Sequence, residues 1–177
     1  WNFEKAEGPD AVQIEVNGHT NLSGGNGAGK TSSLNLVPVF YGADPNRLVL
    51  KVAGKVSFLD YYLPQQSSAL IFEYLRDDGP RLAVLHRHAS GSKHIYRFIA
   101  GGFEETFLIP SIKALVESGA GMGDVLRAIS SLGFDVSRQV DTIIDYRAII
   151  QHDKKLLQRH GRGKNTEREL AYQFCLG

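Results

Sequence analysis

The spacing of apolar and polar residues predicts an α/β domain that opens with a strand and a helix. Residues 12–16 read Val-Gln-Ile-Glu-Val, an alternation typical of a half-buried strand. Asn17-Gly18 follows as a turn signal. Apolar residues then recur at helical spacing through residues 34–40, and Gly42 and Pro45 end that run. A glycine-rich stretch therefore joins the predicted strand to the predicted helix.

Short apolar segments in the middle of the chain predict an antiparallel meander. Turn-forming residues such as Asp78-Gly79-Pro80, Ser90-Gly91-Ser92 and Gly101-Gly102 separate these segments. Residues 45–64, which precede the meander, are expected to form an irregular crossing. The four predicted strands are residues 69–75, 81–86, 94–99 and 103–109.

The pattern becomes helical after Pro110. Residues 112–116 place apolar side chains on one helix face, and Asp124 is predicted to cap a second helix that stops at Gly133. The remaining predictions are a short strand at residues 140–144, a helical pattern over residues 145–160 and a further helix from about Asn165.

The glycine-rich stretch is a complete phosphate-binding loop, G-x-x-x-x-G-K-[ST]. Glycines let successive backbone N–H groups turn toward a phosphate that a Cβ would obstruct. Lys30 is expected to reach the β- and γ-phosphates and Thr31 to ligate Mg²⁺, at the start of a helix whose dipole favours anions. No guanine-selecting N-K-x-D motif is present, which favours ATP. The predicted nucleotide-binding residues are Gly24, Gly25, Asn26, Gly27, Ala28, Gly29, Lys30, Thr31 and Ser32.

Length and composition are consistent with one globular domain over residues 1–177. The chain has 177 residues and is 42% hydrophobic, which is enough to bury an ordinary core. No apolar run approaches the roughly 20 residues needed to cross a bilayer, so we expect a cytoplasmic protein without a membrane partner. Cys175 is the only cysteine and is interpreted as a packed residue near the end of the chain. Trp1 and the final residues suggest that both ends were cut from a longer protein.

Basic residues are concentrated near the end of the chain. The net charge is only +1, yet residues 147–168 contain seven lysines and arginines against Asp153 and Glu167. Such residues neutralise phosphates without reading sequence, so double-stranded DNA is the expected partner. The alternative is a solvated helix, which is what most charge runs form. The predicted DNA contacts are Lys154, Lys155, Arg159, Arg162 and Lys164.

Several stretches resemble the heads of SMC-type ATPases. Residues 22–30 look like the phosphate loop of MukB, the bacterial condensin, and residues 138–146 with the basic helix after them are similar to the region before its coiled coil. Residues 40–42 and 60–64 look more like the related MksB and Wadjet-type condensins. The successive hairpin-like turns also favour an ABC-type head, in which an antiparallel meander accompanies a mixed nucleotide-binding sheet.

The resemblance implies the N-terminal lobe of an ABC/SMC-type P-loop NTPase head, with residues 145–177 leading toward a coiled coil. It implies ATP and Mg²⁺ as cofactors, held between two heads of a homodimer, and a C-terminal head lobe of the same protein as partner. Accessory subunits of the kleisin type and a nucleoid-associated location go with a condensin. Chromosome organisation, plasmid defence and DNA repair stay open.

The chain departs from the family pattern at the catalytic positions. No apolar run followed by Asp-Glu is present and no separate signature helix, so hydrolysis is expected to require the C-terminal lobe. Asp145 stands where a glutamine normally contacts Mg²⁺ at a strand end. It is interpreted either as a metal ligand, better placed than Gln139, or as the N-cap of the next helix. Arg47 is a candidate for the arginine near the nucleotide, with Lys51 and Lys55 as competitors.

Two other functional classes remain compatible with the sequence. One is a self-contained P-loop kinase or GTPase-like enzyme, in which Asp60 or Asp145 replaces the missing carboxylate. The other is a nucleotide-binding module without catalysis.

Overall fold

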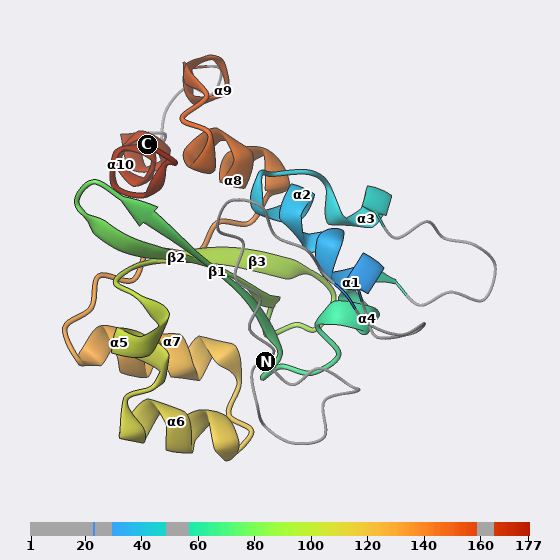
Figure 1. Ribbon diagram of the computed structural model, residues 1–177, viewed down its shortest axis with the longest axis vertical. Helices are drawn as coiled ribbons and strands as arrows, with labels where there is room; N and C mark the ends of the chain where they lie inside the picture. The colour runs from blue at the N-terminus through green and yellow to red at the C-terminus, as the bar shows by residue number, and fades with distance from the viewer. Residues whose placement is uncertain (1–22, 24–29, 49–56, 159–164) are drawn as a thin grey trace.

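A three-stranded antiparallel sheet forms the centre of the computed structural model, which describes residues 23, 30–48, 57–158 and 165–177 (Figure 1). Its strands are β1 (Ala69–Arg76), β2 (Gly79–Arg87) and β3 (His94–Ala100), in the order β1-β2-β3. Ala69 lies opposite His86, and Arg81 lies opposite Ala100. The first three predicted strands and their two hairpins are therefore confirmed.

The fourth predicted strand is wrong, because residues 103–107 form helix α5 (Phe103–Phe107). Gly101, with φ of +144°, turns the chain away from β3. The Glu105 carboxylate then accepts a hydrogen bond of 3.2 Å from the Gly102 N–H, which would otherwise lack a partner at the start of the helix. Glu104 and Glu105 also complement the positive end of the helix dipole. These local contacts favour a helix over a fourth strand.

Three helices cover one face of the sheet (Figure 1). They are α5, α6 (Pro110–Glu117) and α7 (Met122–Ser131), so both predicted helices after Pro110 are confirmed. Asp124 is not the N-cap of α7, since the helix begins after Gly121 and Asp124 pairs with Arg127 in the first turn. Gly133, with φ of +98°, follows the helix end as predicted. The core on this face contains Leu82, Val84, Ile99, Phe107, Ile112, Val125, Leu126 and Ile129.

The other face is covered by helices from both ends of the chain (Figure 1). Here Tyr146 stacks on Tyr96, with ring centroids 4.2 Å apart, and Phe98 stacks on Phe174 at 5.2 Å. These rings join segments about 50 to 76 positions apart along the chain into one core. The helices are α2 (Leu36–Phe40), α4 (Phe58–Tyr62), α8 (Ile143–Ile150) and α10 (Asn165–Phe174). Helix α1 (Lys30–Leu34) precedes α2 and has no buried residue.

Two connecting segments differ from their predictions. Residues 45–64 are not wholly irregular, because they contain α3 (Pro45–Leu48) and α4. The predicted strand at residues 140–144 reduces to one isolated bridge between Tyr96 and Val140, since the Thr142 hydroxyl accepts a hydrogen bond from the Asp145 N–H and begins α8. The helical pattern over residues 145–160 is divided between α8 and α9 (Lys154–Gln158), whereas the helix predicted from about Asn165 is confirmed as α10.

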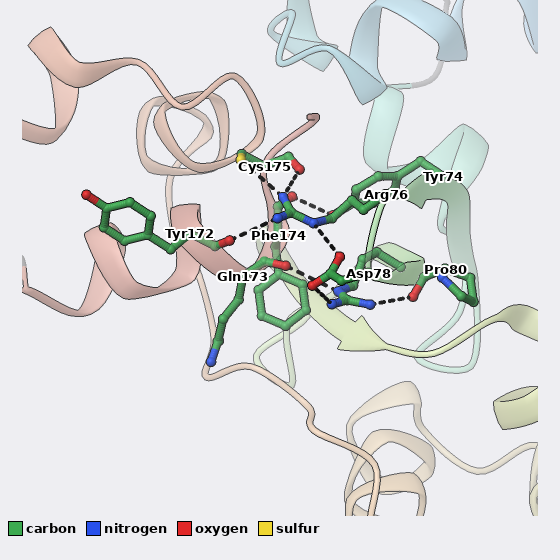
Figure 2. A network of polar contacts seen from close by, with 9 residues as sticks. Tyr74, Arg76, Asp78, Pro80, Tyr172, Gln173, Phe174 and Cys175 are labelled. Atoms are coloured by element: carbon green, nitrogen blue, oxygen red, sulfur yellow. Dashed lines mark hydrogen bonds and ion pairs between the residues drawn. The ribbon is translucent and has the colours of Figure 1, made fainter.

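Side chains from the β1–β2 hairpin bind the C-terminal carbonyls of α10 (Figure 2). Tyr74 donates to the Phe174 carbonyl at 2.6 Å, and Arg76 donates to the carbonyls of Tyr172 and Cys175. Helix-end carbonyls have no partner within the helix, and a cation near them also complements the helix dipole. Arg81 donates to the Gln173 carbonyl at 3.2 Å, and Asp78 pairs with both arginines. The hairpin thus ends α10 and fixes its position.

No helix in the described part of the chain is long and apolar enough to span a bilayer. Cys175 is buried, as predicted.

Replacing Arg76 with Met is expected to destabilise the protein by about 1–3 kcal/mol, because two helix-end carbonyls, one of them partly buried, and Asp78 lose a charged donor. Arg127→Met is the matched control, since Arg127 is exposed on α7, and its effect should stay within about 0.5 kcal/mol. Urea denaturation measures both. Equal midpoints for the two variants would contradict the role of Arg76 in ending α10.

His86 makes stability depend on pH. Its side chain is 3% exposed, and burial lowers its pKa to about 4. The unfolded state, with a pKa near 6.5, then binds the proton more readily, so stability is full above pH 6.5 and falls as the pH drops toward 4. We expect a loss of about 2 kcal/mol between pH 7 and pH 5 from this group. Urea unfolding at pH 7 and pH 5 measures this loss, and in His86→Leu the part that comes from His86 should be absent. If the free energy of unfolding fell equally in both proteins, His86 would not be its source.

Candidate nucleotide-binding site

Lys30, Thr31 and Ser32 form the first turn of α1, where the phosphate-loop motif places them. Lys30 is half-buried and Thr31 is exposed. Helix α1 ends at Leu34 and α2 begins at Leu36, with Asn35 between them. Pro38 in α2 has no N–H to donate to the Leu34 carbonyl. The glycines of the motif, Gly24–Gly29 with Asn26 and Ala28, and the predicted strand at residues 12–16 lie outside the described residues.

Helix α4 lies against this first turn. The Tyr62 hydroxyl donates to the Ser32 carbonyl at 2.8 Å, and the Tyr61 hydroxyl lies 3.2 Å from the Ser32 Oγ. Burial raises the pKa of Tyr62, partly offset by its bond to Ser32, so the phenol stays protonated and acts as a donor. Two adjacent tyrosines therefore fix the backbone and contact the side chain of one predicted nucleotide-binding residue.

Sequence reasoning missed the contribution of α4. Its signal was Ser57-Phe-Leu-Asp60, the spacing of a helix-capping pair. In the structure the Ser57 hydroxyl accepts from the Asp60 N–H at 3.1 Å and donates to its carboxylate at 2.7 Å. The apolar spacing by itself predicts only an irregular crossing over these residues.

Arg87 anchors α4 to the central strand. It donates to the Leu63 carbonyl at 2.7 Å and to the Gly91 carbonyl in the β2–β3 turn at 2.7 Å. It also pairs with Asp60 at 2.9 Å. The pKa of Asp60 is lowered by its hydrogen bonds to Ser57 and to Arg87. Asp60, the carboxylate considered for a self-contained enzyme, is thus engaged in holding α4.

Arg47 does not contact the first turn of α1 in any interaction that the structure describes. It lies on α3 with its side chain 86% exposed, 3.7 Å from the Asp44 carboxylate. Lys51 and Lys55 lie outside the described residues. The role of Arg47 near a nucleotide stays a prediction.

Asp145 lies in the first turn of α8, and neither its predicted strand end nor its N-cap role is correct. Thr142 is the N-cap, and it both accepts from the Asp145 N–H and donates to the Asp145 carboxylate at 2.7 Å. Helix α8 meets the far end of α2, where Tyr146 donates to the Phe40 carbonyl. Within the described residues no hydrogen bond or ion pair joins Asp145 to Thr31, so their shared metal site stays a prediction.

The polar residues near Asp145 do not form an alternative metal site in the described part of the chain. Gln139 donates to the Asp141 carboxylate at 2.7 Å. Over the described ranges, no three histidine, cysteine, aspartate or glutamate side chains form a group that could hold a metal ion.

Only part of the predicted DNA contact is described. Lys154 and Lys155 are exposed in the first turn of α9, where Asp153 accepts hydrogen bonds from the N–H groups of Lys155 and Leu156. Arg159, Arg162 and Lys164 lie outside the described residues. Sequence reasoning did not single out Arg168, which is exposed on α10 beside this segment.

A family model described as a protein of unknown function, DUF3584, matches residues 8–177. The match spans the phosphate-loop motif, the sheet and every helix that the structure describes. No curated protein and no solved structure matches the chain.

Removing the Tyr62 hydroxyl tests the contact between α4 and α1. Tyr62→Phe should lower the free energy of unfolding by about 1 kcal/mol, because the Ser32 carbonyl loses its partly buried donor. Tyr41→Phe is the control, since Tyr41 is 50% exposed on the same helical segment. Urea denaturation gives both values. If Tyr62→Phe, Tyr41→Phe and the unmodified chain all have the same free energy of unfolding, the Tyr62 hydroxyl does not stabilise the first turn of α1.

Proposed function

Because the chain belongs to the DUF3584 family of SMC-like proteins, we propose that it is the ATP-binding N-terminal lobe of an SMC-like DNA-organising or DNA-defence ATPase head. The observation that carries the proposal is the complete phosphate-loop motif ending in the first turn of α1, with Lys30 and Thr31 at the helix start. The N-terminal end of a helix favours a phosphate, and Lys30 would supply the positive charge.

An exposed apolar stripe on α1 and α2 supports the need for a second lobe. Leu34, Val37 and Tyr41 are 54%, 37% and 50% exposed, and their spacing puts them on one helix face. The opposite face, with Val39 and Phe40, packs on the sheet. A helix that is apolar on two sides is normally covered on both. The C-terminal head lobe of the same protein is the proposed cover.

The proposed division of labour follows from the residues present. Lys30 and Thr31 hold Mg-ATP, with Asp145 as a further proposed metal ligand. The carboxylate pair that orients the attacking water would come from the C-terminal lobe, since the chain has no such pair. A second head, related by homodimer symmetry, would close over the nucleotide. The specific likeness to MukB, MksB or Wadjet-type condensins, with kleisin-type subunits, is part of this proposal.

Double-stranded DNA is the proposed macromolecular partner. Lys154 and Lys155 are exposed on α9, and the sequence continues with Arg159, Arg162 and Lys164. Contacts of this kind neutralise backbone phosphates and weaken steeply with salt. The structure argues against Asp60 as the carboxylate of a self-contained enzyme, since both of its oxygens are bound by Ser57 and Arg87. Asp145 in that role stays a prediction.

Lys30→Ala is expected to weaken Mg-ATP binding by about 30-fold or more, because a charged hydrogen bond to phosphate is lost. Calorimetry measures binding, and phosphate release measures turnover. Lys113→Ala is the matched control, because Lys113 is exposed on α6 and pairs only with Glu117 in the described structure. We expect no turnover by the chain alone. Turnover that depends on Lys30 in this chain would refute the half-head and indicate a self-contained enzyme.

A further inference from the structure

Helices α8, α9 and α10 lie together at the C-terminal end of the chain (Figure 1). A hollow of about 260 Å³ lies among them. Beneath it, the buried Leu157 packs with Ala148 and Ala171, one residue from each of the three helices. The hollow is larger than one phosphate and has room for part of a nucleotide. Its lining consists of His152, Lys154, Leu157, Arg168 and Tyr172.

Among the described residues, no carboxylate pairs with Arg168 or Lys154 in this hollow. Most exposed lysines and arginines in the described ranges pair with an acid within 4 Å, as Arg127 does with Asp124 and Lys93 with Asp141. The exposed exceptions in those ranges all lie on α8, α9 and α10. They are Arg147, Lys154, Lys155 and Arg168. The positive charge of the hollow is therefore available to an anion.

His152 occupies a backbone position that favours glycine. Its φ is +48°, the one positive value among the described non-glycine residues. The Asp153 N–H donates to the Ala148 carbonyl and the His152 N–H donates to the Ile149 carbonyl, the paired bonds of a Schellman helix end. Glycine is the usual residue here because it has no Cβ penalty. A histidine that accepts this strain and lines a hollow points to a use for its ring.

An aromatic surface lies beside the charges. Tyr172 is 69% exposed, and its ring meets the His152 ring edge to face at 5.3 Å. Arg168 lies one helical turn before Tyr172 on α10, so the guanidinium and the phenol are neighbours. The Tyr172 carbonyl is held by Arg76, which fixes this part of the helix. A planar cation, an ammonium group and an exposed ring together suit a phosphate with its sugar and base.

We propose that this hollow binds one nucleotide unit of a single-stranded nucleic acid, with Arg168 and Lys154 on the phosphate and Tyr172 against the base. A base inside a duplex cannot stack on Tyr172, whereas an unpaired base offers its face. The inference rests on the proposed nucleic-acid contact and extends it to Arg168, His152 and Tyr172. It does not depend on the ATP site.

Fluorescence anisotropy with a labelled thymidine 30-mer and the matching duplex tests this inference. Arg168→Ala should weaken single-strand binding about 10-fold in 0.1 M salt and reduce the slope of log K against log salt by about 0.7. Arg127→Ala removes the same charge from an exposed site on α7 and should change affinity less than 2-fold. Equal effects of Arg168→Ala and Arg127→Ala would overturn the proposal.

Tyr172→Ala separates stacking from charge. It should weaken single-strand binding about 5-fold or more and leave duplex binding unchanged. Tyr41→Ala, at another half-exposed tyrosine, is the control. Loss of duplex and single-strand affinity to the same extent, or no loss for either, would refute the assignment of the ring. Competition by inorganic phosphate or polyglutamate as effective as the oligonucleotide at equal ionic strength would also overturn it.

His152→Gly distinguishes a binding role from a structural one. It should not lower the melting temperature, because glycine adopts the left-handed conformation more readily, yet it should weaken single-strand binding. Unchanged binding would remove His152 from the site.

The two sites can be tested separately. Lys30→Ala should leave oligonucleotide binding intact, and Arg168→Ala should leave Mg-ATP binding intact. If the unmodified chain bound the oligonucleotide but not Mg-ATP, the proposed function would be contradicted and this inference would stand. If Arg168→Ala bound the oligonucleotide as tightly as the unmodified chain, this inference would be contradicted and the proposed function would stand.

Discussion

The burial of β2 on both faces is the constraint on which the rest of the structure depends. Residues 82–86 are all buried, and strand alternation sends Leu82 and Val84 to one core and Ala83 and Leu85 to the other. Such a strand is stable only when helices cover both sides of the sheet. Helices α8 and α10 belong to the layer that covers one of these faces, together with α4, whose tyrosines contact the first turn of α1. Both candidate sites therefore depend on the helices that cover this face.

Arginines at the ends of the strands hold the helices that carry the two candidate sites. Arg87, at the end of β2, binds the carbonyls around the end of α4, and α4 holds Ser32 through its tyrosines. Arg76, at the end of β1, binds the last carbonyls of α10, the helix that carries Arg168 and Tyr172. In each case a charged donor binds carbonyls at a helix end, where the helix itself supplies no partner.

The sequence predicted those features that depend on local patterns. The three strands, the helices after Pro110 and the helix that begins with Lys30 follow from periodicity and turn residues. Residues 103–109 were predicted as a strand, but the turn at Gly101 and the capping of α5 by Glu105 make residues 103–107 helical, and apolar spacing in so short a segment does not reveal this. The contact of Tyr62 with Ser32 and the hollow around His152 join residues distant in sequence or depend on backbone geometry. Neither is visible without the tertiary structure.

The most direct test of the central claim is a titration of the ¹⁵N-labelled chain with Mg-ATP, followed through its backbone amide resonances. A nucleotide held at the start of α1 should shift the amides of Lys30, Thr31 and the preceding glycines saturably, and Lys30→Ala should abolish those shifts. The amides of Lys154 and Arg168 should stay in place. Shifts confined to Lys154 and Arg168, or none at Lys30, would contradict a nucleotide site at the phosphate-loop helix.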